Sequence, residues 1–284
     1  MSRPTGHTAV MAQRAEPPDA LDFFPTPPWA TRALTAHVIG SLLAPGDCPV
    51  GSRPPGAGYL PTSESSRADR PPGAESGPRV PAGSRNASRH APLRAWEPAA
   101  GEGHMAAVLA ETFDEVWRSD VHDYGGLNAV GSFVGHGPDV APCPDPSPDW
   151  IITNPPFNLA VQFAERALGI AREGVALLLR TAWLEGADRY ERLFRDAPPA
   201  IVAPFVERVP MVKGRWDPDA STATAYAWFV WDLSLARGDS RSASRPPRAA
   251  TILKWIPPGC RTRLTRPGDR ARFAQPSEVG GLLA

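Results

Sequence analysis

The sequence has few cysteines and no long apolar run, and both shortages narrow the class of protein. Only three cysteines, Cys48, Cys143 and Cys260, occur in 284 residues, and they stand far apart. This odd, widely spaced set provides neither a disulfide framework nor a zinc site, so we expect no bound metal and a reducing, cytoplasmic setting. No apolar stretch approaches the roughly 20 residues of a membrane span, and residues 1–20 lack the apolar centre of a signal peptide. A soluble protein without a membrane partner is expected.

The sequence also lacks net charge, with 30 basic and 30 acidic residues. The charges are unevenly placed, because residues 49–95 carry seven arginines against three acids and residues 236–284 carry ten basic residues against three acids. Separate basic segments can contact phosphates even when the total charge is zero, although solvated tails have the same composition. The charge pattern therefore leaves nucleic acid open as a partner.

Residues 149–157, DWIITNPPF, are the most informative stretch. The apolar run before Asn154 predicts a buried strand, which Pro155 and Pro156 end because proline cannot donate to a sheet ladder. In open α/β sheets, ligands bind at the carboxyl ends of the strands. Asn154 offers a side-chain carbonyl, Pro155 a backbone carbonyl and Phe157 a flat apolar face, which together suit a planar ring bearing an amino group. The alternative is a simple strand break in a chain that has 35 prolines.

A second candidate site precedes this stretch. A short strand through residues 95–96 ends at Glu97, and a turn over residues 99–103 leads into a helix. Gly101 and Gly103 allow the backbone to pass close to a ligand, and the helix amino terminus directs N–H groups into the same space. Asp120 ends the next predicted strand, at the spacing of an acid that accepts hydrogen bonds from ribose hydroxyls. Otherwise these acids are ordinary surface residues.

Together these stretches resemble S-adenosylmethionine-dependent methyltransferases that act on amino groups. NPPF is similar to their [DNS]-Pro-Pro-aromatic catalytic motif, EPAAGEGHM to their cofactor motif, and FPTPPW at residues 24–29 to the amino-terminal turn of the adenine-specific members. The resemblance implies that Asn154 and Pro155 accept the two hydrogens of an amino group, and that Pro156 completes the loop. It also implies that Phe157 stacks on a base flipped out of the duplex.

The same resemblance implies a set of cofactor-binding residues: Phe24, Thr26, Glu97, Ala99, Gly101, Gly103, Asp120, Ser132 and Phe133. Thr26 is expected at the methionine end of the cofactor and Glu97 at its amino group. Ser132 departs from the family, where an aspartate commonly precedes the phenylalanine, and a serine is a shorter and neutral partner. Farther along the chain, Trp183, Lys213 and Arg215 stand in loops that we expect to face substrate or DNA. The loop with Lys213, Arg215 and Trp216 suits DNA phosphates or the gap left by an extruded base, and the alternative is a solvated hairpin loop. His104, His122 and His136 lack metal-ligand spacing and are expected to be solvated.

The implied fold is a three-layer α/β/α, Rossmann-like methyltransferase fold with a mostly parallel, seven-stranded sheet. One domain is expected over residues 21–260, with a flexible leader at 1–20 and a basic flexible tail at 261–284. Residues 49–93, rich in Pro, Gly, Ser and Arg, predict a disordered insertion within this domain. Other expected elements are helices at 29–43, 159–171 and 188–197, and strands within 129–135, 174–180, 200–211, 222–233 near the sheet edge, and 250–256.

The expected function is transfer of a methyl group from S-adenosylmethionine to the N6 amino group of adenine in DNA, as in small phage or prophage enzymes. The alternatives are another amino group (N4 of cytosine in DNA, N2 of guanine in RNA, or a glutamine amide in protein) and a cofactor-binding scaffold without activity. The sequence does not indicate the recognition site, a cognate restriction enzyme or the oligomeric state.

Overall fold

The computed structural model describes three stretches of the chain, residues 23–43, 91–233 and 250–274. The predicted leader, most of the predicted insertion 49–93 and Cys48 lie outside the described residues. Leu93 is described and is buried, and its backbone N–H donates to Asp114 Oδ2 at 2.7 Å. Leu93, the last residue of the predicted insertion, therefore belongs to the apolar core, contrary to that predicted boundary.

Within the described residues, eight strands form one sheet in the order β3-β2-β1-β4-β5-β7-β6-β8. The strands are β1 (Arg94–Glu97), β2 (Glu115–Asp120), β3 (Ala129–Val130), β4 (Trp150–Thr153), β5 (Gly174–Arg180), β6 (Ile201–Pro204), β7 (Tyr226–Asp232) and β8 (Ile252–Leu253). Neighbouring strands are parallel, except that β7 runs antiparallel to both β5 and β6. The mostly parallel sheet is confirmed, with eight strands instead of the seven predicted.

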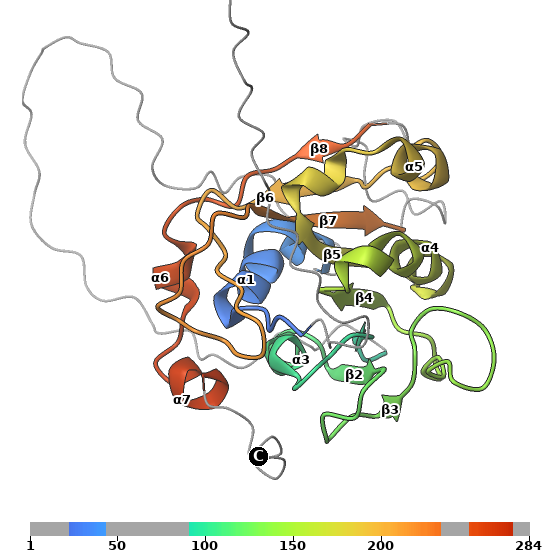
Figure 1. Ribbon diagram of the computed structural model, residues 1–284, viewed down its shortest axis with the longest axis horizontal. Helices are drawn as coiled ribbons and strands as arrows, with labels where there is room; N and C mark the ends of the chain where they lie inside the picture. The colour runs from blue at the N-terminus through green and yellow to red at the C-terminus, as the bar shows by residue number, and fades with distance from the viewer. Residues whose placement is uncertain (1–22, 44–90, 234–249, 275–284) are drawn as a thin grey trace, which may run out of the picture.

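Helices cover both faces of the sheet and give the three predicted layers (Figure 1). One side carries α1 (Pro28–Ala33), the π-helical Leu34–Ile39, α2 (Gly40–Leu43), α3 (His104–Leu109), α6 (Cys260–Leu264) and α7 (Asp269–Phe273). The other side carries the 3₁₀ turns Phe157–Leu159 and Thr181–Leu184, then α4 (Ala160–Ile170), α5 (Ala187–Arg189) and the π-helical Tyr190–Phe194. The predicted helix at 29–43 is therefore continuous, with a wider turn in its middle. None of the helices in the described stretches has the length and apolar content needed to cross a membrane.

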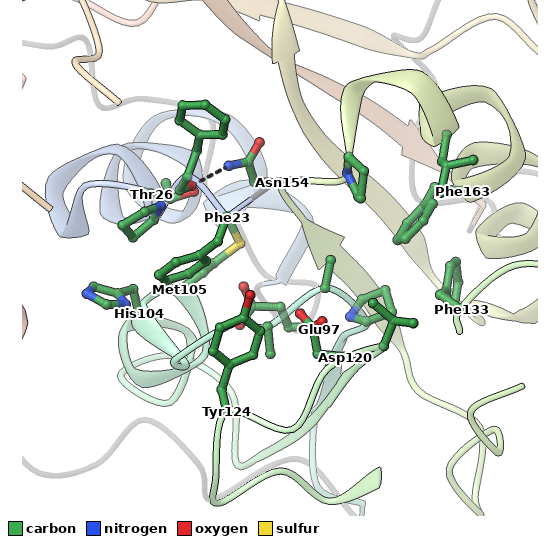
Figure 2. Close-up of a pocket in the computed structure, with 18 of the residues that line it drawn as sticks. Phe23, Thr26, Glu97, His104, Met105, Asp120, Tyr124, Phe133, Asn154 and Phe163 are labelled. Atoms are coloured by element: carbon green, nitrogen blue, oxygen red, sulfur yellow. Dashed lines mark hydrogen bonds between the residues drawn. The ribbon is translucent and has the colours of Figure 1, made fainter. Parts of the chain in front are cut away.

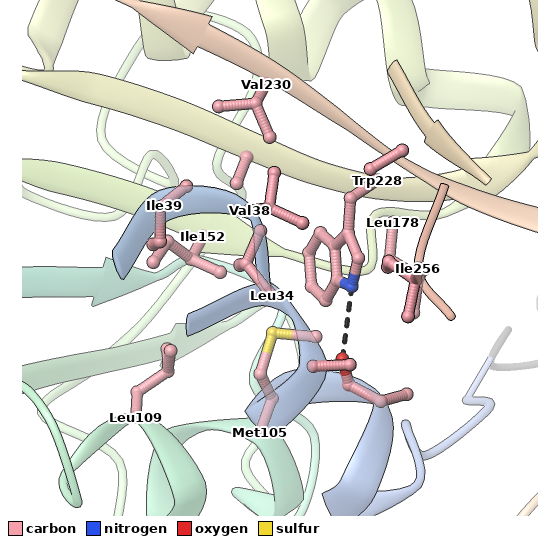
Figure 3. Packing of buried hydrophobic residues seen from close by; sticks show 14 of the residues in the cluster. Leu34, Val38, Ile39, Met105, Leu109, Ile152, Leu178, Trp228, Val230 and Ile256 are labelled. Atoms are coloured by element: carbon pink, nitrogen blue, oxygen red, sulfur yellow. Dashed lines mark hydrogen bonds between the residues drawn. The ribbon is translucent and has the colours of Figure 1, made fainter. Parts of the chain in front are cut away.

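The two faces of the sheet bury separate apolar clusters, because successive strand side chains point in opposite directions. Ile152 of β4 and Trp228 of β7 pack with Leu34 and Val38 after α1, as Figure 3 shows. Ile151 points to the opposite face, toward α4. Both faces are apolar along β4 and β5, which explains why their sequences read as continuous apolar runs.

Strand β7 lies inside the sheet, so the prediction that residues 222–233 run near the edge is wrong. Its residues are buried on both faces, and each face supplies a partner for a tryptophan. Trp228 Nε1 donates to the Ala30 carbonyl of α1 at 3.1 Å (Figure 3), and Trp231 Nε1 donates to the Ala197 carbonyl at 2.9 Å. The short β8 takes the edge position instead.

Residues 261–274 do not form the flexible tail that their basic composition predicts. They form α6 and α7, which return to α1 and α3. Arg32 of α1 is buried, and its two Nη atoms donate to the carboxylate of Asp269 at 2.6 and 2.8 Å. Its Nε donates to Glu111 Oε2 at 2.9 Å, and Arg266 pairs with the same carboxylate at 2.9 Å. A buried ion-pair network therefore fixes the end of the described chain to the amino-terminal helix.

Candidate cofactor and substrate site

The loops that follow β1 and β4, neighbouring strands at the centre of the sheet, open into one hollow with a cavity volume of about 160 Å³. In Figure 2, Glu97 and Asp120 lie on one side of the hollow and Asn154 on another. The predicted site residues on its walls are Phe24, Thr26, Glu97, Ala99, Asp120, Ser132, Phe133, Asn154 and Pro156. The fold therefore brings most of the predicted site residues to one place.

Glu97 supplies a buried carboxyl at the base of the hollow. Its side chain is 2% exposed, and Oε2 has no hydrogen-bond partner within the described part of the chain. Burial raises the pKa of Glu97 well above its usual value, and the nearby charge of Asp120 adds to this, although the backbone N–H of Ala106 opposes it. Because an unpartnered buried carboxylate oxygen is costly, this atom suits an ammonium or another N–H donor of a ligand.

The turn between β1 and α3 depends on its glycines. Gly101 and Gly103 have φ values of 51° and 83°, in the left-handed region that other residues rarely adopt. A Cβ atom at position 101 would lie 2.3 Å from the ring of Phe23, so glycine is required for this ring to lie over the turn. Gly101 and Gly103 therefore shape the turn from behind, while Pro98, Ala99 and Ala100 form its surface toward the hollow.

Asp120, at the end of β2, holds this turn in place. Its Oδ2 accepts the backbone N–H of Gly101 at 2.8 Å, and its Oδ1 accepts that of His122 at 3.1 Å. Burial raises the pKa of Asp120, although these two N–H groups favour the ionised form. Each oxygen has capacity for a further hydrogen bond and Asp120 lines the hollow, so Asp120 is suited to accept hydrogen bonds from ligand hydroxyls.

Asn154 follows β4 and presents an unused acceptor. Its Nδ2 donates to the Phe24 carbonyl at 2.9 Å and lies 3.7 Å from Met211 Sδ. Because only the NH₂ group can donate to a carbonyl, this bond assigns the orientation of the amide. The remaining atom, Oδ1, is buried and has no partner in the described structure. The amino-terminal turn therefore holds Asn154 with its oxygen free to accept a hydrogen bond from a ligand.

Phe157 lies beside the hollow, where its ring belongs to an aromatic group. Its ring centroid is 6.4 Å from that of Phe24 and 6.3 Å from that of Tyr226. The guanidinium carbon of Arg180, at the end of β5, lies 4.3 Å from the Phe157 centroid. Pro155 is buried behind the loop, and Pro156 is the motif proline that lines the hollow.

The other predicted cofactor residues differ in what they offer. Thr26 is 3% exposed and lines the hollow. Phe133 forms an apolar wall, with its ring centroid 5.1 Å from Trp96 and 4.8 Å from Phe163. The hydroxyl of Ser132 donates to the Val134 carbonyl at 2.6 Å and accepts the Val134 N–H at 3.2 Å, so one lone pair remains for a ligand.

Trp183, which we expected to face substrate, is buried in the core. Its ring packs edge-on against Phe194, Phe229 and Trp231, with centroids 5.0 to 6.4 Å away, and it does not line the hollow. The reason is that residues 181–184 form a 3₁₀ turn that directs the indole to the α4 side of the sheet.

The loop that contains Lys213 and Arg215 also lies outside the walls of the hollow. It contacts the site indirectly, because the Gly214 N–H donates to the Phe23 carbonyl at 2.9 Å. Arg215 is exposed and pairs with Asp217 at 3.4 Å. The neighbouring Trp216 is buried against Val108 and Phe273, so it is not available to fill the gap left by a flipped base.

The sequence missed several residues that line the hollow, namely Phe23, His104, Met105, Tyr124 and Phe163. His104 is buried, contrary to the prediction that it is solvated, and burial lowers its pKa. Its Nε2 lies 3.0 Å from the Phe273 carbonyl, so this nitrogen carries the proton and the buried Nδ1 is an acceptor without a partner. The sequence contained a signal for this position, because His104 directly follows Gly103 and the first residue of that helix faces the turn. The described residues contain no group of three or more potential metal ligands.

Comparison with known proteins gives matches among solved structures only. No family model and no curated protein sequence matches the chain. A candidate class I S-adenosylmethionine-dependent methyltransferase from Listeria monocytogenes is 11% identical, with a TM-score of 0.38, over 63% of this chain and 62% of that one. A methyltransferase subunit of a type I restriction-modification system from Streptococcus thermophilus is 9% identical, with a TM-score of 0.37, over 49% of this chain and 39% of that one.

Similarity at this level does not assign a substrate. The chain spans about two fifths to three fifths of the length of these two structures. The chemistry of the site therefore has to be argued from its own residues, of which Glu97 and Asn154 carry the unpartnered oxygens.

Proposed function

We propose that the protein transfers a methyl group from S-adenosylmethionine to the exocyclic amino group of adenine in DNA. The observation that carries the proposal is the pair of buried, unpartnered oxygens, Glu97 Oε2 and Asn154 Oδ1, which belong to two residues that line the same hollow. One oxygen suits the ammonium of the methyl donor, and the other suits the amino group of an acceptor. The order of motifs along the chain, with the turn at residues 24–29 before the other two, supports the adenine-specific type.

The residues of the hollow fit S-adenosylmethionine. Glu97 would hold its methionine ammonium, Asp120 its ribose hydroxyls, and Phe133 would form an apolar wall beside its adenine. Thr26 and the surface of the glycine turn would border its methionine end. When bound, the cofactor supplies a methyl group on a positively charged sulfur, and the chain itself needs only to place the acceptor nitrogen and exclude water.

An exocyclic amino nitrogen is a poor nucleophile because its lone pair is delocalised into the ring. Asn154 Oδ1 and the Pro155 carbonyl would each accept one amino hydrogen, which favours a tetrahedral nitrogen with its lone pair directed at the donor methyl. This is catalysis by position and electrostatics, since the neutral amide of Asn154 is not a strong base. Phe157 would stack on the flipped base, and base stacking on an aromatic side chain contributes about 1–3 kcal/mol, enough to offset much of the cost of flipping.

The experiment is incubation of the purified protein with radiolabelled S-adenosylmethionine and duplex DNA, RNA or a cell protein extract, followed by identification of the labelled product. We expect label in DNA as N6-methyladenine. The matched control is Asn154→Ala, which should bind the donor like the wild type and transfer no label.

Other outcomes would separate the alternatives. Label in N4-methylcytosine, in RNA or only in protein would contradict adenine in DNA while keeping amino-group transfer. Tight donor binding without transfer to any of the three substrates would favour a cofactor-binding scaffold.

A further inference from the structure

Arg180 lies beside the Asn154–Phe157 loop and has none of the roles described above. It is the last residue of β5, directly beside β4 and its Asn-Pro-Pro-Phe loop, and its side chain is exposed. Its guanidinium lies over the Phe157 ring, 4.3 Å from the centroid. No carboxylate in the described part of the chain pairs with it. Arg180 is thus a cation whose observed partner is the ring assigned to the substrate base.

Two other arginines near the sheet are held by acids. Arg192 pairs with Glu165 at 2.9 Å, and Arg94 pairs with Glu115 at 2.6 Å. A guanidinium held by a carboxylate has its charge already compensated, whereas one that lies on an exposed aromatic face is held weakly and retains its five N–H donors. The charge of Arg180 is therefore available to an anion at the edge of the site.

We infer that Arg180 contacts nucleic acid. When the target base stacks on Phe157, the Arg180 guanidinium leaves the ring and pairs with a phosphate of the flipped nucleotide. A flat guanidinium covers an aromatic face much as a base does, so base and Arg180 compete for the same surface. Stacking of a base is the stronger contact, so the base takes the ring. The released guanidinium remains at the rim, where its planar fork matches phosphate oxygens.

This inference rests on the proposed function, and it adds that the substrate carries a phosphate next to the target base. It accounts for a charged residue at a position where an apolar one would cover Phe157 equally well. It also supplies a phosphate contact at the Asn-Pro-Pro-Phe loop. Two residues that the sequence predicted to face substrate or DNA do not fill this role, because Trp183 is buried and Arg215 pairs with Asp217.

The test measures binding of duplex DNA to the full-length protein over a range of salt concentrations. Each phosphate contact adds about 0.9 to the slope of log K against log salt, so Arg180→Ala should lower the slope by about 0.9. Between 50 and 200 mM salt, the ratio of wild-type to variant affinity should then shrink about 3.5-fold. Arg180→Lys keeps the charge and should restore most of the slope.

The matched control is Arg192→Ala, which removes the same charge from an arginine that is paired with Glu165. Its slope should stay within 0.3 or so of the wild-type value, because no phosphate contact is lost. Donor binding should be the same in the wild type and all three variants, since neither arginine lines the hollow.

Three negative results are possible, and they test different parts of the proposal. If the wild type methylates DNA and Arg180→Ala keeps the wild-type salt slope, the role of Arg180 is wrong and the proposed function stands. A lower melting temperature with an unchanged slope would likewise make Arg180 a structural residue. If the wild type binds no nucleic acid at low salt, the proposed function itself fails.

Discussion

The substitution Glu97→Gln should change ligand affinity and protein stability in opposite directions. Gln has nearly the same shape as Glu, so the side chain should stay in its buried position at the base of the hollow. It removes the charge that we assign to the ammonium of S-adenosylmethionine. A hydrogen bond to a charged group contributes about 1.5–3 kcal/mol, so the Kd for the cofactor should rise on the order of 10- to 150-fold.

The unliganded protein should gain stability from the same change, because burial raises the pKa of Glu97. For a carboxyl with a raised folded-state pKa, the stabilising contribution of the protonated form is fully present below the unfolded-state pKa near 4.5 and is lost as the pH rises through the folded-state pKa. Gln cannot ionise, so the melting temperature of Glu97→Gln should fall less than that of the wild type as the pH rises from about 4.5 toward neutrality.

Isothermal titration calorimetry and thermal melts at several pH values would measure both effects. Cofactor binding to the wild type should release protons where Glu97 is partly protonated, and this release should be absent in Glu97→Gln. Asp114→Asn is a useful comparison, because it also replaces a carboxylate near β1 but lies outside the hollow. Unchanged cofactor affinity in Glu97→Gln, with a higher melting temperature, would refute the assignment of Glu97 to the ligand.

Three further predictions follow from the structure. Asn154→Ala should lower kcat at least about 100-fold, the usual effect of removing one transition-state hydrogen-bonding group, while donor titration shows unchanged affinity; loss of donor binding would contradict the role. Phe157→Ala should weaken extrusion of 2-aminopurine from duplex DNA, and equal fluorescence would count against stacking. Asp269→Asn should destabilise the fold by about 1.5–3 kcal/mol in a chemical denaturation, because it removes one of the two carboxylates that pair with the buried Arg32, whereas an unchanged midpoint would show that this pair is not needed.

The local signals in the sequence correctly predicted the ends of the two strands that lead into the candidate site. The strand that ends at Glu97 and the strand before Asn154 are short apolar runs stopped by a glycine turn and by two prolines, so both ends are fixed by nearby residues. Their meeting in one hollow follows from parallel pairing of neighbouring strands, which places their carboxyl ends at the same edge. For these two loops, the order of the motifs in the sequence already implies the arrangement that the fold shows.

The direction in which a side chain points is harder to predict when the residues that it contacts are distant in sequence. Trp183 comes three residues after β5, which is parallel to β4 and ends at the same edge, yet the 3₁₀ turn directs its indole into the core against Phe229 and Trp231. Strand β7 has the same difficulty, because its aromatic residues are compatible with either an edge or an interior position. Two hydrogen bonds mark the interior position of β7, from Trp228 to Ala30 and from Trp231 to Ala197. Ala30 and Ala197 lie in opposite layers and are not adjacent to β7 in the chain.

The carboxyl-terminal helices show why composition misled the prediction there. Residues 261–274 contain five arginines and one aspartate, and a segment with that balance cannot satisfy its own charges. Carboxylates from other parts of the chain compensate two of these arginines, since Glu111 pairs with Arg266 and Asp219 pairs with Arg270. The segment's own Asp269 instead accepts from Arg32 of α1. The same segment carries Phe273, whose carbonyl fixes the tautomer of His104 on the wall of the hollow. A segment that reads as a solvated tail thus orients one acceptor of the candidate site, and its removal should loosen cofactor binding as well as the fold.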